Sequence, residues 1–456
     1  MGIKDRGRVL PASDMTSGPL AKRLLFFALP IAASSILQQL FNSADVAVAG
    51  RFAAPGAIAA VGSNSVIVGL FVNLFVGLSV GANVVVSQYI GQKRGHEATA
   101  AVHTAVTFSV ICGLVMMCIA LALSRFMLEL IDTPEDVLER AVNYLRIYCL
   151  GIPFIVPYNF CAAALRAMGD AKRPMYCLIV SGLLNIVLNL FFVIVCGLDV
   201  SGVAIATVIS NVVSTTMVVV ILCREKGDVR LELRRLRIEK EPLRHILYIG
   251  MPAAVSSVVF SISNICLQSA INGFGSAAVG GMTAAINFEN FCYFVVNAFA
   301  QSAVTFTGHN YGAGEYGRCR KIMRLCMVEG MLGTEALSLI FVLFSSTLIR
   351  IFTVVPEEIE YAMIRVDYIL PFMFLECTYE ITGSSLRGMG RSTMPALFTV
   401  IGTVVFRLIW VYLLFPGTEN LVMLLIVYPI SWALTGGLTL VYYFVVRRKV
   451  LPRGSN

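Results

Sequence analysis

One carboxylate, Asp45, lies within an otherwise uncharged apolar stretch that runs from Leu24 to Gly50. Three polar residues precede Asp45 at helical spacing and share its face, namely Ser34, Gln38 and Asn42. An acidic side chain at membrane depth costs several kcal/mol unless it faces a cavity, an ion or a partner. The pattern predicts that Asp45 binds a cation or a proton, or that it simply forms a hydrogen bond to a neighbouring helix.

Other polar residues are expected at a depth similar to that of Asp45. Asn185 and Asn189 lie one helical turn apart in the fifth apolar stretch, and Thr207 lies near the start of the sixth. Carboxylate, amide and hydroxyl oxygens together suit a hard cation such as Na+, or a protonation site at which Asp45 alone titrates. The alternative is an ordinary network of interhelical hydrogen bonds.

The second half of the chain carries its acids elsewhere. Glu376, Tyr379 and Glu380 are spaced so that they share one face of a helix. Arg407, in the following apolar stretch, is expected at a compatible depth and is predicted to neutralise one of the two glutamates. These residues are compatible both with substrate binding or ion coupling and with structural ion pairing.

Polar residues also remain on the first helix of the second half. Leu267 occupies the position equivalent to the acid of the first half. Asn264 and Gln268 flank that position. Together with Gln38 and Asn42, these residues are candidates for contact with a substrate or with the coupling ion.

The composition is typical of a polytopic membrane protein, because 57% of the 456 residues are apolar and 14% are charged. Twelve stretches are predicted to span the membrane. They lie at residues 24–50, 57–90, 98–123, 142–165, 175–197, 202–223, 246–272, 277–307, 322–348, 366–386, 394–415 and 421–446. The 12 cysteines form no CxxC pair and show no metal-ligand spacing, so they predict neither a disulfide framework nor a zinc site.

The distribution of charge predicts an orientation. Of the 35 Lys and Arg residues, 27 lie in the termini and in every second loop, whereas the intervening loops are acidic, as at 129–139 and 357–360. The positive-inside rule then predicts cytoplasmic termini and a multi-pass protein of the cell (inner or plasma) membrane. This topology explains the net charge of +8, so nucleic acid is not expected as a partner.

The two halves of the chain repeat the same motifs. Arg-Ala-Met-Gly at 166–169 recurs as Arg-Gly-Met-Gly at 387–390, and Pro30 recurs at nearly the same separation as Pro252. Parallel repeats predict an all-α fold of twelve transmembrane helices in two six-helix lobes, related by a pseudo-two-fold axis along the membrane normal. The predicted units are a mobile N-terminus (1–17), an N-lobe (18–223), a linker (224–245), a C-lobe (246–446) and a basic tail (447–456).

The sequence contains no G-x-x-x-x-G-K-[ST] loop for ATP and no H-E-x-x-H zinc motif. We therefore expect neither an enzyme nor a bound cofactor. The energy for transport is expected to come from an ion gradient or from the substrate's own gradient. No metal is expected beyond Na+ at Asp45.

These motifs resemble the multidrug and toxic compound extrusion (MATE) family of secondary transporters. The resemblance covers nearly the whole chain and rests on five segments, at residues 42–51, 88–95, 164–170, 185–189 and 385–390. It implies two six-helix lobes whose alternating access expels cationic, amphipathic drugs in exchange for Na+ or H+.

The resemblance also implies roles for particular residues. It places the family's first-helix acid at Asp45 and the tenth-helix acid of some members at Glu376. Many members have an aspartate where this chain has Asn189, and Thr207 falls where such members have a hydroxyl. The family's seventh-helix acid has no match, because Phe260 lies at about that position.

One acid in the N-lobe favours H+ over Na+, because a Na+ site gains affinity from carboxylate charge whereas a proton needs one buried carboxyl group. We therefore predict an ion-coupled (H+ or Na+) antiporter that exports cationic amphipathic drugs or metabolites, and that acts as a monomer among membrane lipids. The alternative is a flippase for a lipid-linked saccharide, from a related transporter class.

Overall fold

The computed structural model describes residues 15–53, 57–131, 133–225, 229–415 and 420–451, and these residues form helices and no strands. Of the predicted tails, residues 1–14 and 452–456 lie outside the described residues, and 447–450 form the last turn of a helix. The α-helices are α1 (Leu20–Phe52), α2 (Ala57–Gly91), α3 (Gly95–Leu130), α4 (Glu135–Cys149), α5 (Ile152–Ala167), α6 (Lys172–Leu190), α7 (Asp199–Cys223), α8 (Lys240–Asn272), α9 (Ser276–Gly312), α10 (Tyr316–Leu343), α11 (Ser345–Leu348), α12 (Pro356–Ile369), α13 (Phe374–Gly388), α14 (Thr393–Thr399), α15 (Phe406–Ile409), α16 (Leu421–Leu425) and α17 (Val427–Val450).

The helices account for the predicted membrane spans. Among the described residues, nine helices are long and apolar enough to cross a membrane, and the pair α4 and α5, bent by 48°, makes a tenth. The break lies between Cys149 and Ile152, next to Pro153. Proline lacks an amide proton, and the first turn of a helix tolerates this because amides there have no partner within the helix. The two other predicted spans, 277–307 and 366–386, fall on α9 and on α12 with α13.

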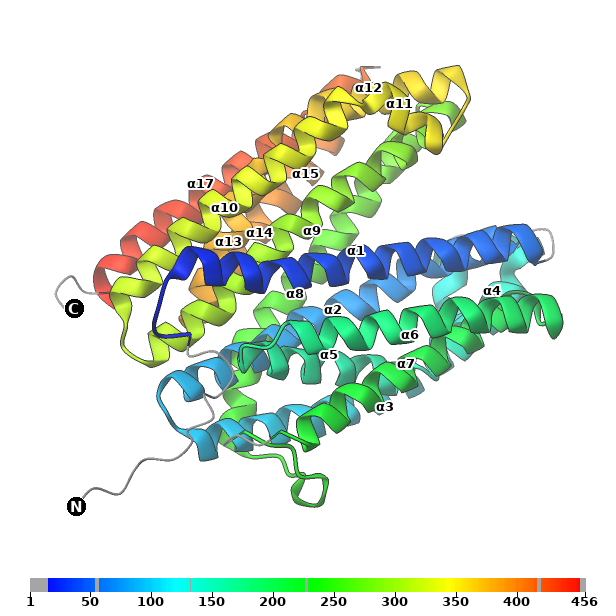
Figure 1. The fold of residues 1–456 in the computed structure, drawn as a ribbon. Helices are drawn as coiled ribbons and strands as arrows, with labels where there is room; N and C mark the ends of the chain where they lie inside the picture. Colours follow the sequence, from blue (N-terminus) through cyan, green and yellow to red (C-terminus); the bar gives the residue numbers. More distant parts are fainter. Residues whose placement is uncertain (1–14, 54–56, 132, 226–228, 416–419, 452–456) are drawn as a thin grey trace, which may run out of the picture.

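The helices form two lobes, with α1 to α7 in the N-lobe and α8 to α17 in the C-lobe (Figure 1). Arg318 donates to the carbonyl of Ser17 at 3.0 Å, and Arg320 donates to the carbonyl of Leu451 at 2.8 Å. Both ends of the described chain therefore lie beside the start of α10. Because they lie on the same side of the membrane, the chain crosses the membrane an even number of times. Figure 1 shows the lobes close together at this end and diverging toward α4, α11 and α12. We call the two ends the closed end and the open end.

Glycines bring the two lobes into contact where α2 crosses α8. A Cβ atom at Gly77 would lie 2.6 Å from the Cα of Ala254, and one at Gly81 would lie 2.2 Å from the carbonyl oxygen of Ile246. Only glycine permits so close an approach of two backbones.

Residues 77–81 also match the G-x-S-x-G pattern of hydrolase nucleophiles. Here, however, the glycines pack helices, and Ser79 donates to the carbonyl of Val76 at 2.8 Å.

The contact between α2 and α9 shows the pseudo-symmetry of the lobes. A Cβ at Gly91 would lie 2.1 Å from the carbonyl oxygen of His309, and one at Gly312 would lie 2.3 Å from that of Gln88. The shift along the chain that carries Gly91 onto Gly312 also carries Gln88 onto His309, so it exchanges the two contacts, as a two-fold axis between the lobes requires. The predicted arrangement of two related lobes is thus confirmed.

Candidate ion and substrate sites

The N-lobe brings four predicted residues into one hydrogen-bonded cluster, formed by Asp45 on α1, Asn185 and Asn189 on α6, and Thr207 on α7. Asn189 Nδ2 donates to Asp45 Oδ1 at 2.5 Å and lies 3.3 Å from Asn185 Oδ1. Asn185 Nδ2 donates to Thr207 Oγ1 at 3.4 Å. The hydroxyl of Thr207 lies 3.4 Å from Asp45 Oδ2 and 2.9 Å from the carbonyl of Val203, so its single proton serves one of them at a time.

Close helix packing positions this cluster. Gly182 lies against the ring of Phe41, one turn before Asp45, and a Cβ at Gly182 would come within 1.9 Å of that ring. This lets α6 approach α1 closely enough for Asn189 to reach Asp45. Directly after Leu190, α6 passes into a π-helical segment, Phe191–Val195, a geometry that is frequent at functional sites.

Two members of the cluster are buried, Asp45 and Thr207 are half-buried, and the cluster keeps an unused acceptor. Asn185 is 5% exposed and Asn189 is fully buried. Within the described residues, Asn189 Oδ1 has no hydrogen-bond partner. This oxygen, the carboxylate of Asp45 and the oxygens of Asn185 and Thr207 are suitable ligands for a hard cation and suitable acceptors for a proton. The residues present therefore fit a Na+ ion as well as a proton.

Two residues that the sequence reasoning did not single out lie near the cluster. Tyr144 and Tyr148 of α4 stack with their ring centroids 6.4 Å apart, and both lie within electrostatic range of the Asp45 carboxylate. Their spacing of one helical turn on a short, amphipathic helix is the signal that could have identified them.

Two other candidates on α1 stay predictions. Gln38 and Asn42 are exposed and line neither the C-lobe cavity described below nor a smaller apolar groove along α8 and α14. Ser34, on the same face, donates to the carbonyl of Pro30 at 2.7 Å. Among the described residues, the expected polar stripe forms its hydrogen bonds to other helices at Asp45.

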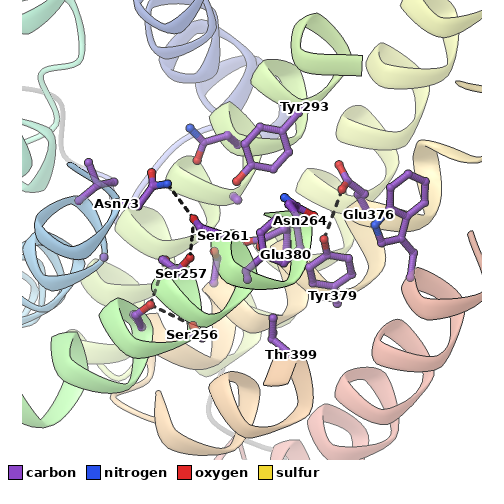
Figure 2. A pocket seen from close by; sticks show the side chains of 18 of the residues that line it. Asn73, Ser256, Ser257, Ser261, Asn264, Tyr293, Glu376, Tyr379, Glu380 and Thr399 are labelled. Atoms are coloured by element: carbon purple, nitrogen blue, oxygen red, sulfur yellow. Dashed lines mark hydrogen bonds between the residues drawn. The ribbon is translucent and has the colours of Figure 1, made fainter. Parts of the chain in front are cut away.

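The C-lobe contains a cavity of about 490 Å³, a volume typical of small-molecule sites. Figure 2 shows side chains from α2, α8, α9 and α13 converging on it. All six candidates predicted in the second half line this cavity, namely Asn264, Gln268, Glu376, Tyr379, Glu380 and Arg407. The cavity also includes Asn73 of α2, which donates to Ser261 of α8 at 3.1 Å, so both lobes contribute to its wall.

Two ion pairs line the cavity. Arg365 Nε lies 2.5 Å from Glu289 Oε1, its Nη2 lies 2.9 Å from Oε2, and the arginine is only 2% exposed. Arg387 lies 3.8 Å from Glu380. Arg365 was missed because the predicted span begins at residue 366, which placed this arginine in a loop.

Arg407 was predicted to neutralise one of the two glutamates, and it acts on Glu376 through its charge without forming a direct ion pair. Arg407 donates instead to Ser431 Oγ and to Asn264 Oδ1, each at 3.0 Å, and no ion pair joins it to Glu376 or Glu380 among the described residues. Glu380 is already paired with an arginine two helical turns further along its own helix. Depth alone, which was the basis of the prediction, does not specify the direction in which a side chain points.

Comparisons with known proteins identify the family. The sequence model of the MatE family matches residues 30–191 and 252–413, so the family's unit occurs twice, once in each repeat. The probable multidrug resistance protein YoeA of Bacillus subtilis is 26% identical over 444 residues, or 95% of each chain. The probable multidrug resistance protein NorM of Thermotoga maritima is 27% identical over 400 residues, which are 85% of this chain and 84% of that protein.

Solved structures show the same fold. An outward-facing multidrug resistance MATE family transporter of the MOP superfamily has a TM-score of 0.88 and 22% identity, with coverage of 96% of this chain and 98% of that chain. A MOP superfamily transporter from Pyrococcus furiosus has a TM-score of 0.89 at the same identity and coverage. With the family match over both repeats, these findings show that the chain is a helical, multi-pass membrane protein that belongs to the MatE (MATE) family of multidrug efflux transporters.

Proposed function

We propose that this chain is a proton-coupled antiporter that exports amphipathic organic cations by alternating access of its two lobes. The observation that carries the proposal is the cluster around Asp45, which holds one carboxylate among neutral amide and hydroxyl groups. A single carboxyl group exchanges one proton, whereas a tight Na+ site gains affinity from further negative charge.

The cluster can satisfy both protonation states of Asp45. The ionised carboxylate accepts hydrogen bonds from Asn189 Nδ2 and from the hydroxyl of Thr207. The protonated carboxyl group donates one hydrogen bond, and amide oxygens of Asn185 and Asn189 are available as acceptors. Uptake or release of a proton therefore rearranges the bonds between α1, α6 and α7, and this rearrangement is the link that we propose between the proton and the movement of the lobes.

The proposed exporter acts as a monomer in the cell membrane, in contact with lipids, and with the closed end and both termini in the cytoplasm. In this orientation the open end faces outward, and export requires the closed end to separate so that the substrate can enter. The basic loops at the closed end support this orientation through the positive-inside rule.

Dye efflux from proteoliposomes tests the proposal. The purified protein is reconstituted, loaded with a fluorescent cationic dye, and energised with a pH gradient or a Na+ gradient, one at a time. We expect efflux to follow the pH gradient without Na+, and we expect Asp45→Asn, which keeps the side-chain volume, to abolish it while the protein still folds. Near wild-type efflux by this variant would contradict the proposed role of Asp45. Arg125→Gln, at an exposed ion pair with Glu129, is a matched control.

A further inference from the structure

The C-lobe cavity is lined by three acids and three arginines, and within the described residues the two ion pairs described above leave one of each without a direct ion pair. These are Glu376, which is 5% exposed, and Arg407, which is 1% exposed. A buried charge is costly unless a partner of opposite charge or several hydrogen bonds compensate it. The cavity therefore offers one positive and one negative group to a ligand.

Three side chains that line the cavity also keep an unused polar atom. Within the described residues, Glu376 Oε2, Arg407 Nη2 and Trp432 Nε1 are buried and have no hydrogen-bond partner. Trp432 is 3% exposed. Buried polar atoms are nearly always hydrogen-bonded in folded proteins, so an unused acceptor and two unused donors in one cavity indicate a missing ligand.

Arg407 is held in place to donate. Its Nε is bonded to Ser431 and its Nη1 to Asn264, which leaves Nη2 free. Its guanidinium lies 4.5 Å from the centroid of the Tyr428 ring and 5.4 Å from that of Phe260. A guanidinium fixed in this way loses little conformational entropy when it binds a carboxylate.

Glu376 is also partly fixed. Its Oε1 accepts a hydrogen bond from the hydroxyl of Tyr379 at 3.4 Å, and its Oε2 remains free. Figure 2 shows this bond in the cavity that also holds Asn264, the partner of Arg407. An ammonium group of a ligand would supply the donor that Oε2 lacks.

We propose that the C-lobe cavity binds a zwitterionic, amphipathic substrate. The carboxylate of this substrate accepts hydrogen bonds from Arg407 and Trp432, its ammonium group donates to Glu376, and its apolar body packs against the aromatic rings of the cavity. The inference rests on the proposed export function and makes zwitterions better substrates than organic cations without a carboxylate. A substrate with an ammonium group alone would leave the charge of Arg407 uncompensated.

Three dansyl probes that differ only in their charged groups test the proposal. Nε-dansyl-lysine carries an ammonium and a carboxylate, dansylcadaverine lacks the carboxylate, and 6-(dansylamino)hexanoic acid lacks the ammonium. Binding to the full chain in lipid nanodiscs at neutral pH is followed by dansyl fluorescence. We expect the zwitterion to bind about tenfold more tightly than either singly charged probe, since it makes one more charge-assisted contact. Equal or tighter binding of dansylcadaverine would overturn the proposal.

Substitutions test which residues cause the preference for the zwitterionic probe. Arg407→Gln is expected to remove the preference for the zwitterion while dansylcadaverine still binds, and Arg407→Lys is expected to restore part of it. Trp432→Phe removes the N–H donor and keeps an aromatic ring, so it tests the carboxylate contact even where Arg407→Gln fails to fold. An unchanged preference in both Arg407→Gln and Trp432→Phe would contradict the assignment. Arg125→Gln, which removes an exposed arginine, is the control and should bind all three probes as the wild type does.

Transport of the same probes separates the two proposals. Binding that follows the expected order without export under a pH gradient would refute the proposed antiport and leave the site intact. Export of dansylcadaverine with no binding of the zwitterion would refute the substrate proposal alone.

Discussion

Gln88 and His309 occupy equivalent positions in the two repeats, and each binds a main-chain carbonyl of the opposite lobe. Gln88 Nε2 donates to the carbonyl of Gly388 at 2.8 Å, and Nε2 of His309 lies 2.5 Å from the carbonyl of Ala167. The shift along the chain that relates Gln88 to His309 also relates Ala167 to Gly388. These bonds join the lobes at the closed end, so both have to break when that end opens.

Removal of these two bonds is expected to favour molecules in which the closed end has separated. One hydrogen bond contributes about 1 kcal/mol, so Gln88→Ala combined with His309→Ala should change the ratio of the two states about thirtyfold. The measurement is the distance between spin labels at Lys93 and Glu315, both exposed at the closed end, in a cysteine-depleted background.

The control for this experiment is Gln92→Ala, which removes an exposed glutamine from the loop that contains Lys93. The control should keep the wild-type distance distribution. An unchanged distribution in the double variant would show that the two bonds do not hold the closed end together.

The buried pair of Glu289 and Arg365 yields a prediction for stability. Glu289→Gln leaves the guanidinium of Arg365 buried without its carboxylate and should lower the free energy of unfolding by about 3–5 kcal/mol. Replacement of both residues by methionine should recover most of this loss, because no unpaired charge remains. Thermal unfolding of the two variants in the same detergent distinguishes these outcomes, and a single variant as stable as the wild type would show that water already screens the pair.

The N-lobe cluster could be predicted from the sequence because a few polar residues stand out in an apolar background and their depths can be counted along each span. Asp45, Asn185, Asn189 and Thr207 meet as expected for that reason. The partner of Arg407 could not be predicted, because hydropathy gives the depth of a residue but not the rotation of its helix.

Errors in the predicted span boundaries caused another residue of the C-lobe cavity to be missed. Arg365 lies just outside its predicted span and yet is almost fully buried. The repeat, in contrast, was evident in the sequence, because Gly91 and Gly312 and the loop motifs at 166–169 and 387–390 keep the same spacing in both halves.

The proposed orientation predicts which loops are accessible from outside the cell. Cysteines introduced at Leu198 and Glu357, both exposed near the open end, should react with a membrane-impermeant thiol reagent on intact cells. A cysteine at Lys240, at the start of α8, should react only after the cells are permeabilised. Labelling of Lys240→Cys but not of Glu357→Cys in intact cells would reverse the proposed orientation.

The last prediction concerns the coupling ion. Asn189 Nδ2 lies 2.5 Å from Asp45 Oδ1, so Asn189→Asp would place a second carboxylate directly beside the first. Two adjacent carboxylates repel each other unless a proton or a cation lies between them, and a second negative charge raises the affinity of an oxygen site for Na+. We expect this variant to gain Na+-dependent dye efflux from proteoliposomes, whereas the wild type responds to a pH gradient alone. Asn189→Ser is the matched control, since it removes the amide without adding charge and should not respond to Na+. Strict Na+ dependence of the wild type, with no response to a pH gradient, would show that one carboxylate suffices for Na+ and that the argument for protons is wrong.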